Sequence, residues 1–155
     1  MNEDKFLNAC KACGAVCCKM CGPDFTENEM KKVLETGYSN FFIKVNPNHY
    51  ELQTKNGACP YLKEDDSCLI YEARPSMCKS WPVYPECKNG KIKYSLIECA
   101  LTPLLSEQEV QALKKEAESI PKELLISSAN KSNLPEREID IGLERFNKFK
   151  QNLIK

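Results

Sequence analysis

The sequence lacks a net charge and long apolar runs, and each absence excludes a class of protein. Lys and Arg number 22, as do Asp and Glu, so the formal net charge of the 155 residues is +0. Nucleic-acid binding needs a basic surplus to neutralise phosphates, so we expect no nucleic-acid partner. Apolar stretches such as Leu124-Leu125-Ile126 fall far short of the roughly 20 residues that cross a bilayer. We therefore expect no membrane association.

A secretory signal is also missing at the N-terminus. Glu3 and Asp4 stand where a signal peptide carries positive charge, and no apolar segment follows before Cys10. We therefore expect a cytoplasmic protein. A reducing cytosol disfavours structural disulfides, so ten cysteines indicate metal binding. The alternative of five disulfides would require an export signal that the sequence does not show.

The cysteines divide the chain, because all ten lie between Cys10 and Cys99. We predict a single domain over 1–155, with a metal-binding part over 10–99 and a helical tail over 106–153. A capping box at Ser106 predicts a helix over 106–119, and Pro121 suits the start of a second helix. A third helix is expected from about 135, because apolar residues recur there at helical spacing: Ile139, Leu143, Phe146, Phe149 and Leu153.

The cysteine-bearing part predicts little regular structure. Thr26 opens another capping box and a helix to about Glu35. Short extended segments over 50–54 and 58–62 flank one Asn-Gly turn, and a second Asn-Gly turn precedes a segment over 92–96. The predicted fold class is α+β: a small, irregular, metal-centred domain with short strands and loops, followed by a helical C-terminal tail packed on it.

The first cysteine group combines a CxxC step with an adjacent pair of cysteines. Cys10 and Cys13 form the step, Cys17 and Cys18 form the pair, and Cys21 lies just beyond. A CxxC step brings two thiolates to one side of a tight turn, as zinc sites and iron–sulfur clusters require. Neighbouring side chains diverge, so Cys17 and Cys18 serve two centres or different irons of one cluster.

The second group contains single cysteines and no further CxxC step, so the zinc-ribbon pattern is absent. Its members are Cys59, Cys68, Cys78, Cys87 and Cys99. Because a cluster accepts ligands from separate segments, an iron–sulfur cluster is favoured over zinc as the cofactor, and zinc stays open. The single histidine, His49, lies in a turn-like stretch and is expected to be an exposed loop residue rather than a ligand.

Thiolate ligands leave an excess of negative charge, which nearby cations must offset. Arg74 is the candidate for this supporting role, because Pro75 fixes the turn that carries Cys78. Tyr61, Tyr71 and Trp81 are expected to pack over the site and exclude solvent.

The motifs Cys-Pro-Tyr-Leu, Cys-Leu-Ile-Tyr-Glu-Ala-Arg-Pro and Cys-Lys-Ser-Trp-Pro, together with the early cysteine group, resemble the YkgJ-type CxxCxxCC family. Those proteins are described as zinc- or iron-chelating domains. The likeness covers roughly residues 10 to 100, although the spacing from Cys13 to Cys17 is one residue longer than in shorter family members. It implies the metal ligands Cys10, Cys13, Cys17, Cys18, Cys59, Cys68, Cys78 and Cys99. Cys21 and Cys87 are additional.

The favoured function is a cytosolic metal-binding protein that holds an iron–sulfur cluster or zinc through its cysteine cluster. It would store or deliver metal, or transfer electrons. One alternative is a protein-modifying or redox enzyme. Some similar proteins are flagellin lysine N-methylases, but this chain is too short for their remaining sequence, and no GxGxxG loop is present. Another alternative is a zinc-stabilised interaction module. The catalytic residues, the number of metal centres, the substrate, any protein partner and the oligomeric state stay open.

Overall fold

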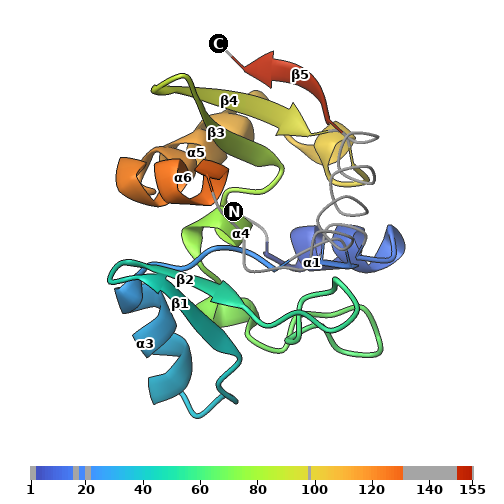
Figure 1. The fold of residues 1–155 in the computed structure, drawn as a ribbon. Coiled ribbons are helices and arrows are strands. Elements are labelled where there is room, and N and C mark those ends of the chain that lie inside the picture. The colour runs from blue at the N-terminus through green and yellow to red at the C-terminus, as the bar shows by residue number, and fades with distance from the viewer. Residues whose placement is uncertain (1–2, 16–17, 20–21, 98, 131–149, 155) are drawn as a thin grey trace.

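The computed structural model describes residues 3–15, 18–19, 22–97, 99–130 and 150–154. Helices and strands alternate irregularly along the chain, so the predicted α+β class is confirmed (Figure 1). In chain order the elements are α1 (Glu3–Ala12), α3 (Glu27–Glu35), β1 (Phe42–Asn46), β2 (His49–Leu52), η1 (Tyr71–Ala73), α4 (Ser76–Lys79), β3 (Val83–Lys88), β4 (Lys91–Ile97), η2 (Thr102–Leu104), α5 (Glu107–Glu118), α6 (Lys122–Asn130) and β5 (Lys150–Ile154).

The strands form two antiparallel sheets. One contains β1 and β2, and the other has the order β3-β4-β5. The turn between β3 and β4 is the predicted Asn-Gly turn: Asn89 and Gly90 have φ values of 53° and 76°, as a two-residue hairpin turn of this type requires. The strands beside it are six and seven residues long. The sheet is therefore more regular than the expected loops.

The other predicted hairpin is mostly absent. Around Asn56-Gly57 the pairing is reduced to one isolated bridge between Lys55 and Ala58. β2 pairs instead with β1, a strand that the sequence analysis did not predict. The physical reason is aromatic packing, because the Phe42 ring in β1 lies edge-on to the buried Phe25 ring with centroids 4.8 Å apart.

Both predicted capping boxes are confirmed. Thr26 and Glu29 cap α3, and Ser106 and Glu109 cap α5. α6 begins directly after Pro121, as predicted. α5 and α6 both contact β3, and α6 also contacts β2, so this part of the tail packs on the strands as expected. α1 is a helix that the sequence analysis did not predict.

The third predicted helix is wrong at its C-terminal end. The predicted helix from about 135 to 149 lies outside the described part of the chain. Lys150–Ile154 is the strand β5, in which Leu153 lies opposite Ser95 of β4. β4 offers a second edge for pairing, and these backbone hydrogen bonds override the helical spacing of the apolar residues.

The cysteine-bearing loops lie between two hydrophobic cores. The first core joins α1, β3 and α5 through Phe6, Ala9, Val83, Leu101, Leu113 and Ala117. The second lies under α3 and the β1–β2 hairpin and contains Phe25, Val33, Leu52, Tyr61, Ile70 and Ala73. Figure 1 shows α4 and its neighbouring loops between these two parts of the fold. No helix within the described ranges combines the length and apolar character needed to cross a membrane.

Candidate metal centre

The C-terminal end of α1 carries the first two cysteines. The Cys13 N–H donates to the Ala9 carbonyl at 3.0 Å, which extends the helical bonding by one residue. Gly14 and Ala15, with φ values of 79° and 51°, then turn the chain back. The Cys13 thiol lies 3.2 Å from the Cys10 carbonyl oxygen. The CxxC step therefore sits at a helix end, where the chain reverses.

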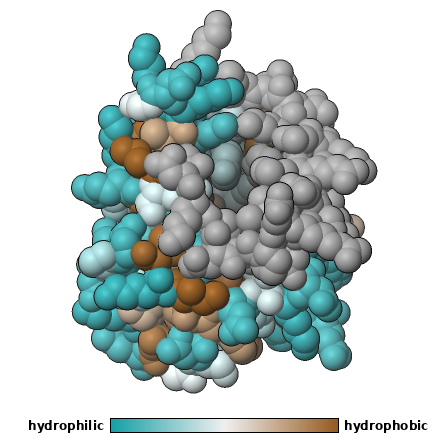
Figure 2. Space-filling model, in the orientation of Figure 1, coloured by the Kyte–Doolittle hydropathy of each residue, from teal (hydrophilic) through white to brown (hydrophobic). Residues whose placement is uncertain are grey.

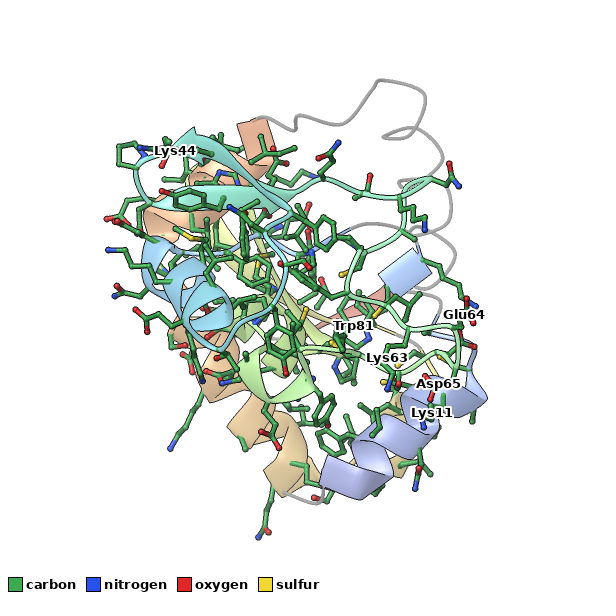
Figure 3. All side chains as sticks on the ribbon, turned by 90° about the horizontal axis from the view of Figure 1, so that it is seen from below. Lys11, Lys44, Lys63, Glu64, Asp65 and Trp81 are labelled. Atoms are coloured by element: carbon green, nitrogen blue, oxygen red, sulfur yellow. The ribbon has the colours of Figure 1, made fainter. Side chains whose placement is uncertain are left out.

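Cys18, the next cysteine within the described residues, connects the first cysteine group to the second. The backbone N–H of Cys59 donates to the carbonyl oxygen of Cys18 at 2.8 Å. The loop from Cys59 to Cys68 is closed on itself by an isolated bridge between Leu62 and Cys68. Two ion pairs reach this loop from the first group: Lys11 to Asp65 at 3.7 Å and Lys19 to Asp66 at 3.0 Å. Figure 3 shows Lys11 and Asp65 at the same edge of the molecule.

Cys78 and Cys99 belong to two later segments of the chain. Cys78 lies in α4, where its N–H donates to the Pro75 carbonyl at 3.0 Å, so Pro75 does set the turn that carries it. Cys99 is held by Thr102, whose hydroxyl oxygen accepts from the Cys99 N–H at 3.1 Å and lies 3.5 Å from its sulfur. The backbones of both cysteines are thereby positioned by local hydrogen bonds.

The thiols are close enough to influence one another's ionisation. Burial raises the pKa of the Cys10 thiol from 9.0 to about 11, and the charges of Cys13, Cys18 and Cys99 add to this rise. Burial also raises the pKa of Cys68 to about 11, with a further contribution from Cys18. The buried Cys78 has a pKa well above 9.0, because of burial first and then Cys18, Cys59 and Cys68. Cys18 thus interacts with both sides of the constellation.

Seven cysteines are therefore connected electrostatically: Cys10, Cys13, Cys18, Cys59, Cys68, Cys78 and Cys99. Cys17, the eighth predicted ligand, and Cys21 lie outside the described residues. Cys87 lies elsewhere and packs against Ile120, Leu124 and Leu125. Among the described residues, no three cysteine sulfurs lie within 4.8 Å of one another. A metal ion that binds three of these thiols would have to draw their side chains closer.

Arg74 supplies positive charge to this region. Its charge lowers the pKa of Cys10, Cys68 and Cys78, opposing the effect of burial. The guanidinium carbon lies 3.9 Å from the centre of the Tyr71 ring, and its Nε donates to the Tyr71 carbonyl at 2.8 Å. Tyr71 therefore holds the arginine in place, which the sequence analysis did not predict. Of the other two aromatic residues, Tyr61 is buried and donates to the Ser39 carbonyl, and Trp81 packs edge-on against Tyr84.

The expectation for His49 is wrong. Its side chain is fully buried in β2, where Nε2 lies 2.8 Å from Oδ1 of Asp24 and Nδ1 lies 2.5 Å from Oγ of Ser127. The turn-like sequence before His49 is the two-residue connection between β1 and β2, and α6 covers the strand that follows. Asp24 and Glu51 beside it were also missed. The two-residue spacing of His49 and Glu51 in a strand was an available signal, whereas no spacing links Asp24 to them.

Partly buried thiols that interact with one guanidinium define a cysteine-rich metal-binding domain. Both zinc and iron bind thiolate sulfur, so the donor set fits either metal. A bound metal would stabilise the thiolates, whose charge is otherwise disfavoured by burial. The chain belongs to the CxxCxxCC family, described as "Putative zinc- or iron-chelating domain", whose pattern matches residues 9–100. The resemblance seen in the sequence is thereby confirmed. Neither a curated protein nor a solved structure matches the chain.

Proposed function

We propose that this chain is a cytosolic metal-binding protein that holds an iron–sulfur cluster, or alternatively zinc, through its cysteine cluster. The observation that carries the proposal is the hydrogen bond from the Cys59 N–H to the Cys18 carbonyl oxygen, which joins the two cysteine groups of the family pattern. The mutual effects on cysteine pKa values agree with this arrangement. The ligands would be these seven cysteines and Cys17. Arg74 would offset their negative charge.

The spread of the thiols favours the iron–sulfur cluster. A zinc ion has about four ligands at about 2.3 Å from one point, whereas a cluster distributes its irons and accepts thiolates over a larger volume. The described cysteines come from distant segments, and they outnumber the four thiolates of one zinc ion or of one cluster. If all seven connected cysteines bound zinc, two ions would be needed, with Cys18 between the two sides. The proposed roles are storage, delivery or electron transfer.

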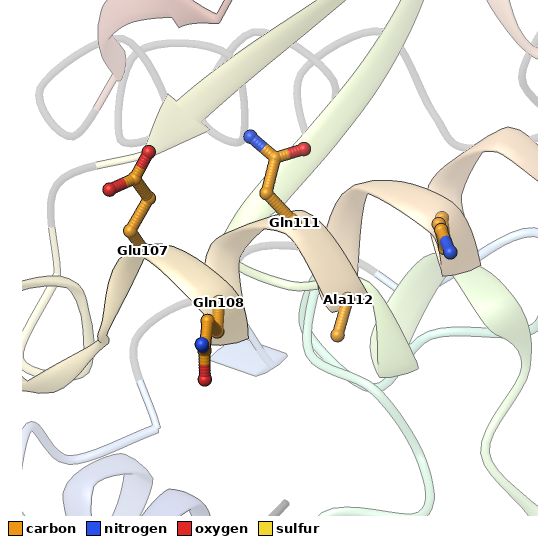
Figure 4. A pocket seen from close by; sticks show the side chains of 5 residues that line it. Glu107, Gln108, Gln111 and Ala112 are labelled. Carbon is orange, nitrogen blue, oxygen red and sulfur yellow. The ribbon is translucent and has the colours of Figure 1, made fainter.

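The pocket drawn in Figure 4 gives no support to the enzyme alternative. The pocket in Figure 4 is lined by Glu107, Gln108, Gln111, Ala112 and Lys115, all from the single helix α5, and none of them is a cysteine. A substrate pocket serving the cluster would be lined by residues from the segments that carry the thiols. The interaction-module alternative requires a broad apolar surface. On the face shown in Figure 2, apolar residues lie in small groups separated by hydrophilic ones.

Purification of the full chain without oxygen tests the proposal. The absorption spectrum, iron, acid-labile sulfide and zinc should be measured on the same sample. A cluster predicts a brown protein with iron and sulfide in comparable amounts. A colourless protein with stoichiometric zinc would overturn the cluster and leave a zinc-chelating domain. Absence of both metals would overturn metal binding itself.

A further inference from the structure

A second group of potential metal ligands lies apart from the cysteines. Asp24, His49 and Glu51 each offer one donor atom, and these three atoms all lie within 4.8 Å of one another. Two of the three come from β2 and one from the segment before α3. The donors are oxygen and nitrogen, which distinguishes this group from the thiols.

Backbone pairing explains why these side chains meet. Phe25 and Tyr50 exchange two backbone hydrogen bonds of 2.9 Å and form an antiparallel bridge. Their neighbours Asp24 and Glu51 are therefore directly opposite in a pair without hydrogen bonds, where side chains approach most closely. His49 and Glu51 are two residues apart in the strand, so they point to the same face.

This pairing places two carboxylates across from each other, an arrangement that is unfavourable for like charges. The fully buried imidazole of His49 stands beside them. The hydroxyl of Ser128 donates to the second oxygen of Asp24, so that carboxylate is further oriented from α6. A divalent cation bound between Asp24 and Glu51 would interact favourably with both carboxylates.

The Nδ1 atom of the His49 ring already has a hydrogen-bond partner. Oγ of Ser127 lies 2.5 Å from Nδ1 of His49 and also accepts from the Asn46 side chain at 3.0 Å. A hydroxyl oxygen can accept two such bonds, so Nδ1 can keep its proton and donate it to Ser127 while Nε2 offers its lone pair to a metal. A partner on the second ring nitrogen is the usual way in which proteins orient a metal-binding histidine.

We propose that Asp24, His49 and Glu51 form a second metal site, which binds a divalent first-row transition-metal ion through nitrogen and oxygen. The 2.8 Å between Nε2 and Oδ1 of Asp24 is close to the roughly 2.9 Å between adjacent ligands of an octahedral ion bound at about 2.0–2.1 Å. When the metal binds, it takes the place of the contact between His49 Nε2 and Asp24 Oδ1. Any proton that these two atoms share is then released. Three protein donors leave coordination positions of the metal ion open for water. None of the three donors is a thiol, so this site does not depend on the cysteines.

The test uses the fact that the chain has one histidine. The full chain, labelled with ¹⁵N and carrying its cysteine-bound metal, is titrated with Zn²⁺ and separately with Co²⁺ while the imidazole nitrogen resonances are recorded. We expect one equivalent of Zn²⁺ to shift Nε2, and Co²⁺ to broaden the ring signals. Glu51→Gln and Asp24→Asn should weaken this binding by about tenfold or more. Glu107→Gln, an exposed carboxylate on α5, is the matched control and should leave it unchanged.

Two results would overturn the proposal. The ring signals would be unmoved by either ion, or they would titrate equally in the wild type and in folded Glu51→Gln. His49 would then be a buried structural residue bonded to Asp24 and Ser127. Circular dichroism establishes folding, and if Asp24→Asn does not fold, Glu51→Gln decides alone. Elemental analysis reports the cysteine-bound metal separately, so failure of one site is distinguishable from failure of the other.

Discussion

The backbone of Cys59 is hydrogen-bonded to that of Cys18, N–H to carbonyl oxygen, at 2.8 Å. This bond joins the two cysteine groups, which are far apart in the sequence. It places Cys18 where its thiol interacts with Cys10 on one side and with Cys68 and Cys78 on the other. Cys18 is thus the residue whose loss should affect the whole site.

Replacement of single cysteines should therefore rank them by position. Cys18→Ser, Cys13→Ser, Cys68→Ser and Cys78→Ser should lose bound metal, because each removes a thiolate from the constellation. Cys87→Ser is the matched control and should retain it, since Cys87 packs against the Ile120, Leu124 and Leu125 cluster. Metal per chain is the measurement. Equal loss in Cys87→Ser and Cys18→Ser would contradict the assignment of ligands.

Arg74 should influence metal affinity without binding the metal. Its charge opposes the raised pKa values of three cysteines, so Arg74→Gln should weaken metal binding by about 10- to 100-fold, as loss of a partner outside the ligand set typically does. Lys79→Gln, which removes a charge next to Cys78 in sequence, is the control. Competition with a chelator of known affinity provides the measurement, and equal effects of the two substitutions would argue against a specific role for Arg74.

The metal-free chain should lose stability as the pH rises. Cys10 and Cys68 have a pKa of about 11 in the folded chain against 9.0 in the unfolded one, so the folded state retains their protons longer. Their contribution is fully present below pH 9.0 and is lost as the pH rises towards about 11.

Urea unfolding of chelator-treated protein across this pH range measures the effect. A variant with both Cys10 and Cys68 replaced by Ser is the control, because Tyr and Lys side chains also titrate there. The variant should show a flatter pH dependence than the wild type. If stability depended on pH identically in the two proteins, burial would not raise the pKa of the Cys10 and Cys68 thiols.

The core beneath α5 should matter for stability independently of the metal. Leu113 is completely buried between α1, β3 and α5, so Leu113→Ala should lower the free energy of unfolding by about 2–5 kcal/mol. Leu104→Ala is the control, because that side chain is 52% exposed and exposed substitutions usually stay within about 0.5 kcal/mol. Denaturation of the metal-loaded protein measures both. If Leu113→Ala and Leu104→Ala lowered the free energy of unfolding equally, Leu113 would not be a core residue.

Local signals in the sequence were sufficient for several elements. The capping boxes at Thr26 and Ser106 and the Asn89-Gly90 turn depend on residues within one turn of each other, and all three are present. The cysteine spacing and the surrounding motifs were sufficient to predict the family to which the chain belongs. Metal ligation by the individual cysteines stays a prediction.

Features that depend on distant partners could not be predicted. β5 exists because β4 has a second edge, and the apolar spacing around Leu153 contains no information about that edge. His49 is buried because Ser127 and Asp24, distant in the chain, close around it. The pairing of β1 with β2 likewise depends on Phe25 as an aromatic partner. Each error arose where tertiary contacts decided the outcome.

X-ray absorption at the edge of the bound metal tests most directly whether the cysteines hold it. The full chain should be purified without oxygen and measured before and after replacement of Cys18 and Cys78 by Ser. We predict a first coordination sphere dominated by sulfur, at about 2.3 Å, which diminishes in the variants. A first sphere of nitrogen and oxygen alone, at about 2.0–2.2 Å and unchanged in the variants, would contradict thiolate binding by this chain.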